Sequence, residues 1–131
     1  MAEHCWSLRV YYEDTDSMGR VYHANYLKFM ERARTEFVRE KGWHLDKVAE
    51  ELGLAFVVKQ LQIDYQRAAK FNDQLNIYTK LAKISPASIT FEQSIALASS
   101  ALLVCAALVK VVCIDLKGGT VQRIPPQLSM E

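Results

Sequence analysis

Residues 25–41 read NYLKFMERARTEFVREK, and their apolar side chains recur with the period of an α-helix. One apolar stripe, spaced at i, i+4, i+7 and i+11 and widened on both sides, is formed by Tyr26, Met30, Ala33 and Phe37 together with Leu27, Phe29 and Val38. Gly42 follows as a stop signal, and Arg39 and Lys41 place cations at the negative end of the helix. The stretch predicts one long helix that is buried on a broad face.

The segments on either side of this helix show the alternation of β-strands. Residues 5–13 precede it and place Trp6, Leu8, Val10 and Tyr12 on one face. A short helical piece at about 45–52 follows it. Turn signals such as Asn72-Asp73 and Ser85-Pro86 then separate four further predicted strands, at residues 56–66, 75–84, 89–97 and 101–116.

The order of a strand, a long helix and four hairpin-connected strands predicts an α+β fold. The helix then lies on one face of an antiparallel five-stranded sheet, within a single domain over residues 1–131. The other face of the sheet needs a cover, and a second subunit is the economical one. Half of the residues are apolar, which is more than a single internal layer between one helix and one sheet can bury. We therefore expect a homo-oligomer, either a homodimer or a homotetramer.

Composition excludes several classes of protein. Sixteen basic and 15 acidic side chains give a net charge of +1 without a charged run, which argues against nucleic acid or a membrane surface as partner. Cys5, Cys105 and Cys113 lack metal-ligand spacing, so we expect buried free thiols and neither disulfides nor a metal site. Residues 1–7 do not resemble a signal peptide, and the apolar stretch 101–109 is too short for a transmembrane segment. These features predict a cytoplasmic protein.

The stretch before the long helix, residues 12–26, reads YEDTDSMGRVYHANY. It places Asp14, Asp16, Gly19 and His23 between the end of a strand and the start of the helix. Free N–H groups at a helix start stabilise developing negative charge on oxygen, and a neighbouring carboxylate can act as nucleophile or general base in acyl transfer. The same residues also suit a capping loop with a glycine turn. Spacing alone leaves both interpretations open.

Residues 12–34 closely resemble the signature of the 4-hydroxybenzoyl-CoA thioesterase superfamily, and within it the YbgC-like (Tol–Pal-associated) acyl-CoA thioesterase branch. The matching strings are Tyr12-Glu13-Asp14-Thr15-Asp16, Gly19-Arg20-Val21-Tyr22-His23, Asn25-Tyr26 and Glu31-Arg32-Ala33-Arg34. The resemblance is weaker over the rest of the chain and includes the ending Arg123-Ile124-Pro125. It implies the hot-dog fold, in which a sheet wraps around a central helix.

The resemblance also implies an activity and a set of catalytic residues. The expected enzyme hydrolyses short- to medium-chain or aromatic acyl thioesters to the free acid and CoA, without a cofactor. Asp16 matches the catalytic carboxylate, as nucleophile or as general base. The N–H of His23 would polarise the thioester oxygen, and its imidazole would orient the acyl group or carry a proton. Tyr12 matches a supporting hydroxyl.

Further residues are expected to bind the substrate. Gly19 would let the backbone approach it, and Val21 and Tyr22 belong to the same matching string. The phosphates of CoA need cations, for which Lys83 and Arg123 are candidates. The acyl carrier is CoA or an acyl carrier protein.

Three alternatives accompany this interpretation. For Asp14 we favour a structural role, accepting hydrogen bonds from loop N–H groups, over a catalytic one. Glu31 could supply the acidic residue from the helix, but its spacing from Arg34 favours a structural ion pair. The whole protein could instead be a non-catalytic acyl-thioester-binding scaffold, or use the same fold for hydratase or dehydratase chemistry.

Overall fold

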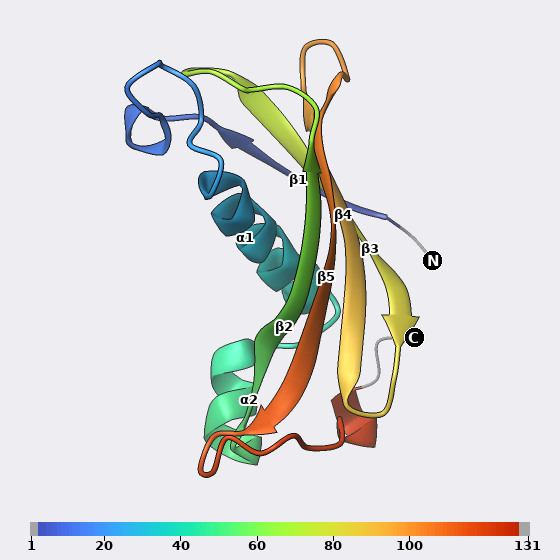
Figure 1. The fold of residues 1–131 in the computed structure, drawn as a ribbon. Coiled ribbons are helices and arrows are strands. Elements are labelled where there is room, and N and C mark those ends of the chain that lie inside the picture. The colour runs from blue at the N-terminus through green and yellow to red at the C-terminus, as the bar shows by residue number, and fades with distance from the viewer. Residues whose placement is uncertain (1–2, 129–131) are drawn as a thin grey trace.

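The computed structural model describes residues 3–128, in which a five-stranded antiparallel sheet curves around a long helix (Figure 1). The elements are, in chain order, β1 (His4–Arg9), α1 (Asn25–Glu40), α2 (Leu45–Leu52), β2 (Leu54–Tyr65), β3 (Gln74–Ile84), β4 (Ser88–Leu97) and β5 (Leu103–Asp115), with single 3-10 turns at Tyr12–Asp14 and Pro126–Leu128. The strand order is β1-β3-β4-β5-β2, so β1 and β2 are the edges of the sheet. The α+β prediction is confirmed.

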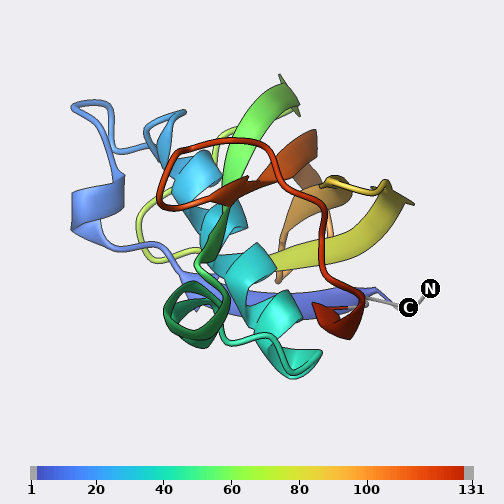
Figure 2. The same cartoon turned by 90° about the horizontal axis from the view of Figure 1, so that it is seen from below.

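Helix α1 lies in the concave face of the sheet, as the view from below shows (Figure 2). It buries one apolar stripe, and Ala33 is small enough at its centre to bring the helix backbone close to the strands. Phe37 meets Phe91 of β4 edge to face, with ring centroids 6.0 Å apart. The predicted stripe is therefore the face that forms the core. Because the sheet holds this face along most of its length, the start of α1 has a fixed position.

The first strand is shorter than predicted. It ends at Arg9, which pairs with Gln74, the first residue of its partner β3. The Val10 N–H then bonds to the Asp73 carbonyl, and the chain turns into Tyr12–Asp14. Tyr12 consequently leaves the face that carries Trp6. At the other end of the described chain, Pro126–Leu128 forms a 3-10 turn in which Leu128 is buried.

The cysteines are free thiols, but they are not all buried. Cys105 and Cys113 lie in the core as expected, whereas the prediction is wrong for Cys5, which is exposed on β1. Burial raises the pKa of Cys105 to about 12 and also raises that of Cys113. Within residues 3–128 no group of three or more His, Cys, Asp and Glu side chains is arranged to hold a metal ion.

Exposed apolar side chains gather on the edge strand β2. Val57, Val58 and Leu61 are 41%, 51% and 37% exposed. The convex face of the sheet also carries polar pairs such as Lys80 and Glu92, whose charged atoms lie 2.9 Å apart, so it is not uniformly apolar. Solvent-exposed apolar surface therefore lies along the β2 edge of the sheet as well as on its convex face. None of the helices described in residues 3–128 is long and apolar enough to cross a membrane.

Candidate active site

Asp16 opens a tight hairpin between the 3-10 turn and α1. Thr15 and Val21 pair across it, the Asp16 N–H donates to the Arg20 carbonyl at 2.8 Å, and the Gly19 N–H donates to the Asp16 carbonyl at 3.0 Å. Gly19 has a φ of +76°, a left-handed conformation that favours glycine. The turn itself therefore accounts for this glycine. The hairpin holds Asp16 at the surface, just before the helix begins.

The two carboxylate oxygens of Asp16 have different surroundings. Oδ1 accepts the Met18 N–H at 2.9 Å and the Arg20 N–H at 3.3 Å. Oδ2 accepts no hydrogen bond from residues 3–128. One oxygen thus orients the carboxylate, and the other is available for chemistry.

Asp14 is buried and ties three segments together. Its Oδ2 accepts the Tyr11 N–H at 2.9 Å, and its Oδ1 accepts the side-chain amide of Asn25 at 3.0 Å. Its carbonyl accepts the Tyr22 N–H at 2.9 Å. The expected structural role is confirmed: Asp14 fixes the end of the first strand against the start of α1.

The entry to α1 presents unpaired donors. The N–H groups of His23 and Ala24 donate to no acceptor among residues 3–128, and His23 is exposed. The His23 carbonyl is held by the Tyr65 hydroxyl, which donates to it at 2.9 Å from the end of β2. Burial raises the pKa of Tyr65 above its ordinary value. The sequence does not single out Tyr65, because the alternation along β2 gives the face that Tyr65 occupies but not its hydrogen-bond partner 42 residues away.

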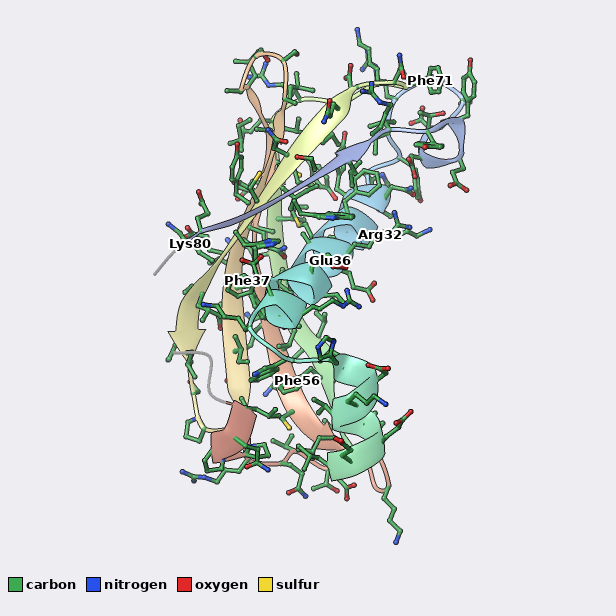
Figure 3. The ribbon with its side chains drawn as sticks, turned by 180° about the vertical axis from the view of Figure 1, so that it is seen from behind. Arg32, Glu36, Phe37, Phe56, Phe71 and Lys80 are labelled. Carbon is green, nitrogen blue, oxygen red and sulfur yellow. The ribbon has the colours of Figure 1, made fainter. Side chains whose placement is uncertain are left out.

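The other residues expected in the loop have varied positions. Tyr12 is 74% exposed and stacks on Phe71, with ring centroids 3.8 Å apart; Phe71 is labelled in Figure 3. No hydrogen bond joins the Tyr12 hydroxyl to any residue of the described part. Val21 is buried and donates its N–H to the Ala69 carbonyl, while Tyr22 is partly exposed against the His23 ring.

Lys83 and Arg123 lie far from Asp16 in the same chain. Lys83 is near the end of β3, nine residues and roughly 30 Å from Gln74, which is the end beside the loop. Arg123 is close to the same distant turn, since the next residue, Ile124, donates its N–H to the Pro86 carbonyl. Both side chains are exposed. A single chain does not bring either cation to the candidate site.

A cavity of 570 Å³ runs between α1 and strands β2, β4 and β5. It begins at Leu27, near the helix start, and reaches Trp43 and Phe56 at the far end, where Figure 3 shows Phe56 beside α2. Its lining is mostly apolar but includes Glu31 and Arg34. The predicted ion pair between these two is wrong: Arg34 donates to Gln93 Oε1 at 3.0 Å, and no ion pair within residues 3–128 joins it to Glu31.

Comparison with known proteins gives concordant matches. A family model described as the thioesterase-like superfamily matches residues 10–130. The acyl-CoA thioesterase YbgC of Haemophilus influenzae is 50% identical over 109 residues, or 83% of this chain and 79% of that protein. The acyl-CoA thioester hydrolase YbgC of Escherichia coli O6:H1 is 43% identical over 110 residues, or 84% and 81%. A crystal structure of a probable thioesterase from Bartonella henselae has a TM-score of 0.88 at 35% identity, covering 95% of this chain and 100% of that one.

Proposed function

The chain belongs to the thioesterase-like superfamily and is a thioester hydrolase, and from this premise we propose that it hydrolyses acyl-CoA with Asp16 as the catalytic carboxylate. The observation that carries the proposal is the position of Asp16. Its free Oδ2 is presented by a hairpin that leads directly into the unpaired N–H groups of His23 and Ala24. A carboxylate and an oxyanion site are the two parts that thioester hydrolysis needs.

The reaction follows from these parts. The thioester carbonyl oxygen accepts hydrogen bonds from the His23 and Ala24 N–H groups, where the helix dipole adds to the stabilisation of the oxyanion. Asp16 Oδ2 either attacks the carbonyl carbon, which gives a mixed anhydride that water then hydrolyses to the acid and the free Asp16 carboxylate, or removes a proton from the water that attacks the carbonyl carbon. In both routes the C–S bond breaks, the sulfur leaves and gains a proton, and water supplies the new oxygen of the acid. The exposed His23 imidazole can exchange the proton with solvent.

The acyl group extends along α1 into the cavity. The cavity begins one helical turn beyond His23, at Leu27, and its volume of 570 Å³ suits a small ligand. Apolar walls such as Phe91 and Val109 favour hydrocarbon. We therefore propose short- to medium-chain or aromatic acyl groups as substrates.

A second copy of the chain completes the site. The edge strand β2 leaves backbone donors and acceptors and the side chains of Val58 and Leu61 uncovered, and such an edge is commonly closed by pairing with another strand. Antiparallel pairing of β2 with its symmetry copy about a two-fold axis places opposite ends of the two sheets together. Lys83 and Arg123 of the second copy then approach the loop with Asp16, where they can meet the phosphates of CoA.

The test is thiol release from a graded series of straight-chain acyl-CoAs and from benzoyl-CoA. We expect turnover of the shorter and aromatic substrates and a fall once the chain exceeds the cavity. Absence of turnover across the series contradicts the proposal. If a non-hydrolysable thioether analogue then binds tightly, the chain is an acyl-thioester-binding protein instead. Hydration of an enoyl-CoA without thiol release would indicate hydratase chemistry.

A further inference from the structure

Arg34 is a cationic residue in the mostly apolar lining of the cavity. It lies on α1, half-buried, and it lines the cavity between the helix and the sheet. Its Nη1 donates to Gln93 Oε1 at 3.0 Å, and no carboxylate among residues 3–128 forms an ion pair with it. A desolvated guanidinium with one neutral acceptor retains several unused N–H donors. The cavity therefore contains a positive charge without a direct counter-charge.

Gln93 holds this guanidinium in place. Gln93 is 1% exposed, and its Nε2 donates to the Met30 carbonyl at 3.0 Å and to Thr79 Oγ1 at 2.9 Å. Both amide hydrogens are thus used, and its oxygen is directed at Arg34. The network spans α1, β3 and β4, the elements that form the core. Arg34 is consequently oriented before any ligand arrives, which reduces the entropy lost on binding.

The charges around the cavity favour an anion. The charged lining residues are Lys28, Glu31 and Arg34, which sum to +1. Burial lowers the pKa of Arg34, and the charge of Glu31 partly offsets this effect. A guanidinium nevertheless stays protonated in proteins and binds a carboxylate through two parallel hydrogen bonds.

On the basis of the proposed function, we infer that Arg34 binds a carboxylate at the distal end of the acyl chain, in addition to the oxygen of Gln93. Acyl thioesters of dicarboxylic acids are then the preferred substrates. Nine residues separate Arg34 from Asn25 at the start of α1, a rise of roughly 13 Å along the helix. Leu27, in the first turn of α1, and Arg34 lie seven residues apart on the same face of the helix and both line the cavity, so an acyl chain that enters beside Leu27 runs along α1 toward the guanidinium. The guanidinium stem covers part of that distance, because helical side chains lean toward the N-terminus.

The experiment compares glutaryl-, adipyl- and suberyl-CoA, each with the unsubstituted acyl-CoA of equal carbon number. In the wild-type protein we expect kcat/KM to favour at least one dicarboxylic member over its partner. In Arg34→Gln we expect that selectivity ratio to fall by about 10- to 100-fold, the loss typical of a hydrogen bond between charged groups. The matched control is Arg32→Gln, since Arg32 is an exposed arginine on the same helix that points away from the sheet (Figure 3). We expect the control to leave the ratio unchanged.

Several results would overturn the inference. One is a wild-type protein that disfavours every dicarboxylic substrate. Another is an Arg34→Gln protein that loses activity equally on both members of each pair, or that dissociates into single chains, which would make Arg34 a structural or interface residue. If Arg34→Gln does not fold, Arg34→Lys is tested in its place. Lysine keeps the positive charge but lacks the two parallel N–H donors of a guanidinium, so the selectivity for the dicarboxylic substrate should still fall. If the wild type hydrolyses neither member, the proposed function fails. Titration with matched thioether analogues of the same acyl-CoAs then decides the role of Arg34 alone.

Discussion

Tyr65 connects the end of β2 to the start of α1 through one hydrogen bond, from its hydroxyl to the His23 carbonyl at 2.9 Å. A peptide group is planar, so fixing this carbonyl also fixes the Ala24 N–H, which points in the opposite direction. That N–H is one of the two donors of the proposed oxyanion site. Tyr65 is therefore a positioning residue, although it lies outside the motif that carries Asp16.

Replacing Tyr65 with phenylalanine is expected to lower kcat by about tenfold, or about 1.4 kcal/mol of transition-state stabilisation, with little change in KM. The reason is that the oxyanion donors lose their orientation while the acyl cavity stays intact. Steady-state kinetics with an acyl-CoA that the wild-type protein hydrolyses checks this prediction. Tyr78→Phe, on β3, is the matched control and should have wild-type kinetics. A Tyr65→Phe protein with unchanged kcat would refute the positioning role.

At the scale of elements, the apolar periodicity of the sequence predicts those helices and strands whose positions depend on local burial. The helix at Asn25–Glu40 and the later strands follow from periodicity, because one face of each must be buried. The end of β1 at Arg9 does not follow from periodicity, because the position where its partner β3 begins determines it. In the same way, spacing along α1 suggests Glu31 as the partner of Arg34. The folded sheet instead supplies the buried amide of Gln93, 59 residues away.

Strand β5 gives the protein a dependence on alkaline pH. Burial raises the pKa of the Cys105 thiol from 9.0 to about 12, so the folded state retains a proton that the unfolded chain releases above pH 9. The free energy of unfolding should therefore decrease between pH 9 and pH 12, by about 1.4 kcal/mol per pH unit from this thiol. Tyr26, whose pKa is also raised, adds to the decrease at higher pH.

Urea unfolding of the wild type and Cys105→Ala at pH 8, 9 and 10 checks this dependence. The variant is expected to be less stable at pH 8, because it leaves a cavity, but to lose less stability as the pH rises. The gap between the two proteins should narrow by about 1 kcal/mol from pH 9 to pH 10. Parallel curves would show that burial does not raise the pKa of Cys105 in the folded protein.

At the scale of the whole molecule, the candidate groups lie at two ends. Asp16 and His23 are at one end of α1, whereas Lys83 and Arg123 are at the opposite end of the sheet. The uncovered apolar side chains follow β2, the edge between these ends. A second copy paired along β2 accounts for both facts. The sequence indicated an oligomer through its apolar surplus and through the second face of the sheet, which needs a cover, but it did not indicate the β2 edge as a shared surface.

Val58→Lys should disrupt this assembly, because Val58 is 51% exposed on the edge strand and a lysine there opposes strand pairing. Sedimentation is expected to show at least two copies for the wild type and one for the variant. Val58 also lines the cavity, so the sedimentation result, and not a fall in turnover alone, decides the role of β2 in assembly. Val121→Lys is the control: Val121 is 58% exposed but lies outside β2, so neither property should change. A wild-type protein that is active as a single chain would contradict the shared site.

The most direct test of the account is the turnover of Asp16→Asn on the best acyl-CoA substrate, measured beside Asp46→Asn, an exposed aspartate on α2. Asparagine keeps the hairpin acceptor for the Met18 N–H but cannot attack a carbonyl carbon or remove a proton from water. The account predicts that kcat falls by about 10²- to 10⁴-fold in Asp16→Asn, with an unchanged melting temperature, and is unaffected in Asp46→Asn. An Asp16→Asn protein that folds and retains full turnover would contradict it.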